Sequence, residues 1–189
     1  MNLLKVLAPA LAVLLSPVPA AAQSSFMSGD FISAVRERDG TKAMDLLRSK
    51  GTVVLNTRDD KGETPLNVAI AGRDDEWTGF LLSEGADPNL GGRNGDTPLI
   101  AAARVGYLGA AADLIRLRVK IDAINRMGET PLIVAVQQRQ TAIVKLLLAA
   151  GADPDRADSA AGLTARDYAK RDTRSREILQ LIQAKKPKA

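Results

Sequence analysis

The sequence contains no cysteine and no histidine, and aromatic residues make up only 3% of its 189 residues. These absences remove thiol nucleophiles, histidine general bases and nearly every zinc or iron–sulfur ligand pattern, so we expect no cofactor. Few aromatics beside abundant Ala and Leu favour closely packed helices over a β-sandwich. With 46% hydrophobic residues and a net charge of +4, the sequence predicts one domain with a buried core. The charge is too modest to indicate nucleic-acid binding.

Residues 1–22 have the three-part layout of a secretory signal peptide. Lys5 precedes an apolar stretch at residues 6–15, prolines follow, and an alanine run ending at Ala22 supplies the small residues of a cleavage site. The alternative is an uncleaved membrane anchor, but the apolar stretch is shorter than the ~20 residues that span a bilayer. We therefore expect cleavage after Ala22 and a periplasmic or secreted chain. No stable membrane span would remain, and residues 23–29 would form a short linker.

One pentapeptide recurs along the rest of the chain. Gly-x-Thr-Pro-Leu occurs three times with a period of 33 residues, at 62–66, 95–99 and 128–132. In each copy Thr is suited to cap a helix, and Pro suits the first helical position, where an N–H has no partner anyway. Apolar residues then follow at i, i+3 and i+4, and paired aliphatic residues indicate a second helix further along.

Turn, helix, helix and loop within 33 residues resembles the ankyrin repeat, whose signature is Thr-Pro-Leu-His-x-Ala. The resemblance covers about residues 30–184. It implies an all-α ankyrin-repeat solenoid of about five helix pairs joined by hairpin-like turns. The expected divisions are a degenerate cap, three full repeats, a second cap and a basic tail, at residues 30–60, 61–93, 94–126, 127–159, 160–184 and 185–189.

The sequence departs from this pattern at two kinds of position. The signature His is replaced in all four copies, by Asn67, Ile100, Ile133 and Asp167. In the family that His links neighbouring turns, so its loss is expected to affect stability more than function. Arg118 stands where Gly85 and Gly151 end their helices, which predicts a positive φ angle at Arg118. Arg73 and Arg139 similarly stand where the second repeat has Gly106.

The resemblance implies an interaction module, not an enzyme, that binds an unknown protein partner through its hairpin tips and inner-helix face. The family's variable surface positions can be carried over residue by residue. They give a candidate partner-binding set of Asp60, Lys61, Glu63, Arg93, Asn94, Asp96, Arg104, Arg126, Met127, Glu129, Gln137 and Gln138. The alternative interpretation of each residue is an ordinary solvated tip.

Three local features have competing interpretations. The carboxylates of Asp74, Asp75 and Glu76, and of Asp153, Asp155 and Asp158, could serve a hydrolase, but they fall at helix starts or repeat loops, where acidic residues also complement the helix dipole. The aspartates at residues 153–158 faintly suggest a calcium loop, yet the bidentate Glu of such a loop is missing. Trp77 could anchor a partner, but it occupies an aliphatic position of the second helix, which favours core packing.

The C-terminal end provides the second candidate function. From Thr164 onward the chain has eight Lys or Arg residues and three Asp or Glu residues. This basic cap and tail could bind an anionic surface, either lipid or an acidic partner. A solvated terminus is the simpler interpretation. No aromatic residue is interleaved with the lysines of residues 185–188, so single-stranded nucleic acid has little support as a partner.

Overall fold

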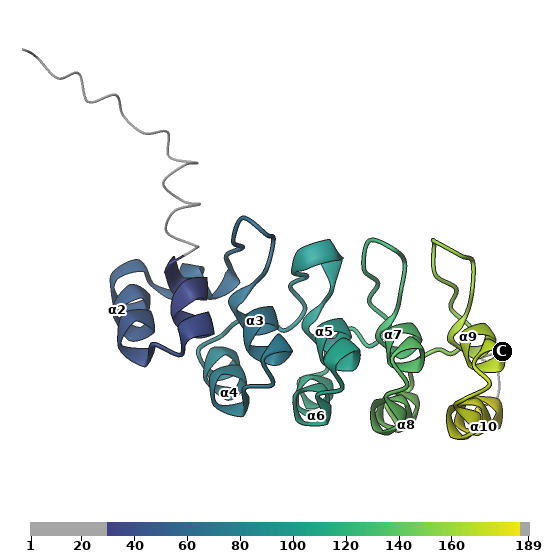
Figure 1. The fold of residues 1–189 in the computed structure, drawn as a ribbon. Helices are drawn as coiled ribbons and strands as arrows, with labels where there is room; N and C mark the ends of the chain where they lie inside the picture. The colour runs from purple at the N-terminus through teal and green to yellow at the C-terminus, as the bar shows by residue number, and fades with distance from the viewer. Residues whose placement is uncertain (1–29, 186–189) are drawn as a thin grey trace, which may run out of the picture.

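The computed structural model describes residues 30–185. The predicted signal peptide and linker, and most of the predicted tail, lie outside the described residues. The described chain forms five helix pairs stacked side by side into an elongated array (Figure 1). Within residues 30–185 the sole strand-like pairing is an isolated bridge between Ala157 and Thr164. The expected all-α solenoid is confirmed.

Each pair contributes one helix to each of two layers. A helix at residues 30–37 and α2 (Gly40–Lys50) form the first pair, followed by the 3-10 helix Thr52–Asn56. The four inner helices of the remaining pairs are α3 (Pro65–Ala71), α5 (Pro98–Val105), α7 (Pro131–Gln137) and α9 (Ala165–Arg171). Their outer helices are α4 (Asp75–Ser83), α6 (Leu108–Arg116), α8 (Thr141–Ala149) and α10 (Arg176–Ala184).

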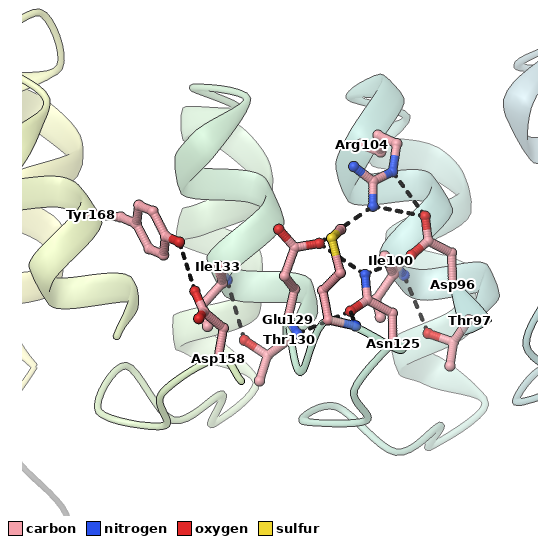
Figure 2. A network of polar contacts seen from close by, with 11 residues as sticks. Asp96, Thr97, Ile100, Arg104, Asn125, Glu129, Thr130, Ile133, Asp158 and Tyr168 are labelled. Carbon is pink, nitrogen blue, oxygen red and sulfur yellow. Dashed lines mark hydrogen bonds and ion pairs between the residues drawn. The ribbon is translucent and has the colours of Figure 1, made fainter. Parts of the chain in front are cut away.

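Threonine starts the inner helices as the repeat motif predicts. The side-chain oxygens of Thr64, Thr97 and Thr130 each accept a hydrogen bond from the backbone amide three residues later, at 3.2–3.3 Å. Figure 2 shows two of these caps. Thr164 forms a reciprocal capping box with Asp167, so the fourth copy retains its helix start without the proline.

The core runs continuously between the inner helices. Leu66, Leu99 and Leu132 are 2%, 1% and 0% exposed, and α5 packs against both α3 and α7. Small side chains such as Ala102 and Ala135, both fully buried, let these helices approach closely. Each repeat therefore buries its apolar face only against its neighbours, as in other solenoids.

The outer layer also contributes buried apolar residues. Trp77 on α4 is 8% exposed and meets Phe80 edge to face, with ring centroids 5.5 Å apart. This confirms the core-packing interpretation of Trp77.

One replacement of the signature His retains the link between turns. Asn67 is 3% exposed, and its Nδ2 donates to the backbone carbonyl of Asp96 in the next turn at 2.7 Å. Ile100 and Ile133 are fully buried and add apolar contact instead. The first and second turns are therefore joined by a polar contact that the repeat signature alone did not indicate.

Arginine also occupies left-handed turns between inner and outer helices. Arg73 and Arg139 have φ angles of 52° and 54°, and Gly106 has 72°, so the predicted equivalence is confirmed. The Arg73 guanidinium donates to the Val105 carbonyl of the next repeat, and Arg139 Nε lies 2.6 Å from Asp172 Oδ2. These contacts offset the steric cost of about 1 kcal/mol that a non-glycine residue meets in this conformation.

Arg118 lies in the same backbone region without such a contact. Its φ angle is 57°, and Gly85 and Gly151 have 96° and 93°, which confirms the predicted positive φ. Within the described residues the exposed Arg118 side chain forms no ion pair or side-chain hydrogen bond. Arg118 therefore carries the steric cost with no compensating interaction.

Candidate functional site

Four hairpin tips project from one edge of the stack, above the inner helices in Figure 1. We define the first to fourth tips by residues spaced 33 apart, as 59–63, 92–96, 125–129 and 158–162. Each tip contains a glycine with a positive φ angle, between 66° and 78°. The turns therefore repeat with the same period as the helices and bring their side chains into a row.

The second tip is built differently from the other three. Asp59 and Asn125 open their tips with a side-chain oxygen that accepts two backbone amides at 2.9–3.0 Å, and Asp158 does the same at 2.6 and 3.1 Å. Gly92 holds the equivalent position and has no side chain to offer. This tip closes instead through a 3-10 turn in which Asn94 has a φ of 58°.

The structure places the predicted partner-binding residues in three classes of exposure. The exposed ones are Asp60, Lys61, Arg93, Asn94, Arg126, Met127 and Gln138. The partly buried ones are Glu63, Asp96, Arg104 and Gln137. Glu129 is only 7% exposed, so the expectation that it lies on the open surface is wrong.

Glu129 is buried because it belongs to a polar network between the second and third tips (Figure 2). Arg104 Nη2 lies 2.7 Å from Asp96 Oδ2 and 3.7 Å from Glu129 Oε2. Asn125 Nδ2 donates to Asp96 Oδ1 and to Glu129 Oε2, both at 2.8 Å. The network satisfies both carboxylates inside the chain and fixes the two tips relative to each other.

The cations of the tips surround a common hollow of about 530 Å³. Arg58, Lys61, Arg93 and Arg126 line it, and none of them forms an ion pair within the described residues. Arg58 donates to the Gly91 carbonyl at 2.7 and 3.0 Å, which fixes its guanidinium at the rim. The site therefore combines three consecutive tips and one sign of charge.

A second, smaller hollow lies on the inner face below the same tips. It has a volume of about 220 Å³ and shares Arg93 and Asn94 with the first hollow. Glu63, Asn67 and Arg104 are among its other lining residues. Arg93 and Asn94 thus lie between the two hollows, and both are exposed members of the predicted set.

Sequence reasoning missed Arg58 and the structural role of Asn125. Aligning the chain by its period of 33 residues would have placed Asp59, Gly92 and Asn125 together and drawn attention to the unusual second tip. Arg58 gave no comparable signal, because its role depends on reaching the Gly91 carbonyl in the following repeat.

The fourth tip is closed by contacts within the chain. The Tyr168 hydroxyl donates to Asp158 Oδ2 at 2.6 Å, and Asp158 is 5% exposed. Burial alone would raise the pKa of Asp158, but hydrogen bonds from Tyr168 and the tip amides outweigh it and hold this pKa below its ordinary value.

The aspartates considered for calcium have partners inside the chain. Asp155 pairs with Arg166, Nε to Oδ1, at 2.7 Å, while Asp153 accepts the Asp155 amide at 2.9 Å. Across residues 30–185 no group of three or more candidate ligands is placed to hold a metal ion. Their geometry is that of a repeat loop.

The acidic residues at the start of α4 have structural partners too. Asp74 caps the helix by accepting the Trp77 amide at 3.1 Å, and it pairs with Arg38 at 2.7 Å. Asp75 accepts a hydrogen bond from the Tyr107 hydroxyl. Burial and this carboxylate together raise the pKa of Tyr107 to about 12. The arrangement gives both aspartates structural partners at the start of α4.

The C-terminal cap uses part of its positive charge internally. Besides pairing with Asp155, Arg166 donates to the backbone carbonyls of Ile182 and Lys185 at 2.9 and 3.1 Å. Lys185 Nζ in turn donates to the Leu148 carbonyl at 3.1 Å. Arg166, at 16% side-chain exposure, therefore ties α9 to the end of α10 and does not form part of an open basic face.

Comparisons with known proteins agree with this geometry. Residues 74–158 match the family described as ankyrin repeats (3 copies). The ANK repeat-containing protein nipk-1 of Caenorhabditis elegans is 34% identical over 126 residues, which cover 59% of this chain and 21% of that protein. Human NF-kappa-B inhibitor alpha is 32% identical over 128 residues, covering 64% of this chain and 40% of the relative.

The matches concern the repeats alone, since the chain spans well under half the length of these relatives. In residues 30–185 no helix has the length and apolar character needed to cross a bilayer. The motif period, the stacked helix pairs and the family match all agree. This chain contains ankyrin repeats, and its described residues form an ankyrin-repeat solenoid, a fold that generally serves as a protein–protein interaction module.

Proposed function

We propose that this protein is an exported interaction module that binds a protein partner through its hairpin tips and inner-helix face. The observation that carries the proposal is the shared hollow of the first three tips. Lys61, Arg93 and Arg126 are exposed around it, while the helices that stabilise the stack lie beneath. Side chains in this position are free to contact a partner, because the fold does not depend on them.

The polar network between the second and third tips supports this proposal. Asp96, Arg104, Asn125 and Glu129 hold the second and third tips in one arrangement before any partner arrives. A surface fixed in advance loses less conformational entropy on binding, which favours affinity. Met127, within the third tip, is 43% exposed and offers an apolar contact.

Binding is proposed in preference to catalysis. The sequence has no Cys or His, and the carboxylates considered for hydrolysis at the start of α4 cap a helix and accept hydrogen bonds from the chain. A relative also bears on the proposal, since NF-kappa-B inhibitor alpha is named for another protein on which it acts. We propose by analogy that this chain, too, acts by binding.

The alternative function is binding of an anionic surface through the C-terminal cap and tail. It is weaker, because Arg166 and Lys185 are used in contacts within the chain. Arg171 and Arg176 remain exposed, so a variant of this pair tests the alternative directly.

Export is a separate part of the proposal and rests on the pattern of residues 1–22. The intact mass of the protein recovered from the periplasm tests it. If the chain is exported and cleaved, its mass should equal that of the chain from Gln23 onward. A mass that still includes Met1 to Ala22 would contradict the proposed cleavage.

The binding proposal is tested with a partner captured by the processed protein, identified by mass spectrometry and then purified. Arg93→Ala combined with Arg126→Ala should weaken its affinity at least tenfold, about 1.4 kcal/mol, because Arg side chains are frequent hot spots. The melting temperature should stay unchanged, since both residues are exposed.

Arg171→Ala combined with Arg176→Ala is the matched control, because it also removes two positive charges, but from the cap. This pair should leave affinity nearly unchanged. A loss of binding in the cap pair and none in the tip pair would replace this proposal with the anionic-surface alternative.

A further inference from the structure

The tip hollow concentrates positive charge that the fold leaves uncompensated. Arg58, Lys61, Arg93 and Arg126 come from three consecutive repeats and line one space of about 530 Å³. Within the described residues none has an ion-pair partner. Like charges held around one hollow create a local positive potential, which attracts anionic groups and steers their approach.

The carboxylates nearest the hollow are mostly occupied elsewhere. Asp59 pairs with Arg36 at 3.2 Å and accepts two amides of its own tip. Asp96 and Glu129 face Arg104 in the polar network between the second and third tips. In the first tip Asp60 is exposed, and the partly buried Glu63 forms no ion pair within the described residues. The four cations therefore still outnumber the free acidic groups at this surface.

The unusual second tip adds backbone to this surface. In the first and third tips an Asp or Asn side chain accepts the amides of Lys61 and Met127. Gly92 offers no such acceptor to the equivalent Asn94 amide. Gly91, Gly92 and Gly95 also line the hollow, so part of its wall is backbone without side-chain cover. The Gly92 and Gly95 amides already donate to the Asp96 and Gly92 carbonyls. The Asn94 amide, which lies beside the guanidinium groups, is the backbone donor suited to a carboxylate.

We infer that the segment of the partner bound here is an extended peptide rich in Asp and Glu, whose carboxylates lie against Arg93, Arg126 and Lys61. The inference rests on the proposed binding function of the tips and specifies its chemistry. Arginine favours this occupant because its planar fork binds a carboxylate through two hydrogen bonds. No aromatic side chain lines the hollow, so nucleic-acid bases have no surface there on which to stack.

The test uses the full processed chain and fluorescence anisotropy with a labelled peptide of alternating Glu and Ser. The matched peptide replaces every Glu with Gln. We expect the Glu peptide to bind, with an affinity that falls as salt rises, and the Gln peptide not to bind. Arg93→Ala with Arg126→Ala should lower the affinity for the Glu peptide at least about tenfold.

Two further variants separate charge from geometry. Arg48→Ala with Arg176→Ala removes the same charge from exposed positions on α2 and α10 and should change the affinity less than about twofold. Arg93→Lys with Arg126→Lys retains the charge but loses the fork, and its affinity should fall between those of the wild type and the alanine pair.

Equal binding of the Glu and Gln peptides, or equal loss in the tip pair and the α2/α10 pair, would overturn the inference. Tip-dependent binding of an oligothymidylate that exceeds peptide binding would also overturn it, in favour of nucleic acid. If the tip pair weakens binding of the purified partner while the Glu peptide neither binds nor competes, the acidic inference fails and the proposed function stands. If the tip pair does not change binding of the partner, the acidic inference and the proposed function both fail.

Discussion

The hairpin tips and the C-terminal cap both collect positive charge, but they use it differently. In the cap, Arg166 pairs with Asp155 and donates to two backbone carbonyls, so its charge stabilises the end of the stack. At the tips, Arg93 and Arg126 are exposed and have no ion pair within the described residues. The difference shows that the number of basic residues does not locate a binding surface. Arg171 and Arg176 of the cap are also exposed and unpaired within the described residues, so the tips differ in that their unpaired cations are grouped around one hollow.

The largest expected effect comes from a substitution in the hydrophobic core, which supports both the tips and the cap. Leu99 is 1% exposed between α3 and α7, so Leu99→Ala should cost about 2–5 kcal/mol of unfolding free energy. That is a large share of the ~5–15 kcal/mol expected of a domain. Urea denaturation measures it, and an unchanged midpoint would mean that Leu99 does not support the stack as described.

A smaller loss should follow from removing the cap arginine. Arg166→Ala removes the donor of the Lys185 carbonyl and the ion-pair partner of Asp155, and it leaves the Ile182 carbonyl with the Lys185 amide alone. It should cost about 1–3 kcal/mol by thermal unfolding. Partner affinity measured below the melting temperature should be unaffected. A variant that melts normally but no longer binds would reverse the roles assigned to cap and tips.

The same pair has a defined pH dependence. The hydrogen bond from Arg166 holds the pKa of Asp155 below its ordinary 3.8 in the folded chain. The stabilisation is therefore present above pH 3.8 and is lost as the pH falls below that value. Arg166→Ala should accordingly lose less stability on acidification than the wild type, as measured by unfolding between neutral and acid pH. An identical acid profile in both proteins would contradict this contribution.

The smallest expected effect separates two arginines in the same backbone conformation. Arg118→Gly should stabilise the protein by a few tenths to about 1 kcal/mol, because glycine removes a steric cost but adds entropy to the unfolded chain. Arg139→Gly should not stabilise it, since that side chain pairs with Asp172 at 2.6 Å. Thermal melts of both variants measure the difference. A clear loss of stability in Arg118→Gly would reject the strain at that position.

The fold could be predicted because its information is local. The Thr-Pro start, the apolar spacing and the glycine turns recur every 33 residues, and even the positive φ of Arg118 follows from aligning one repeat on the next. The predicted site was less complete. Glu129 was expected at the surface, yet contacts with Arg104 and Asn125 bury it. Such contacts form between side chains of neighbouring repeats. Aligning one repeat on the next does not show which of these side chains meet in space.

The most direct test of the central claim is the position of the bound partner on the stack. Amide NMR spectra of the full processed chain, recorded during titration with the purified partner, report each backbone position separately. We predict that the shifts concentrate at residues 61–63, 93–96 and 126–127, with the cap at 164–185 nearly unchanged. Shift changes concentrated in residues 164–185, with none at the tips, would contradict the account.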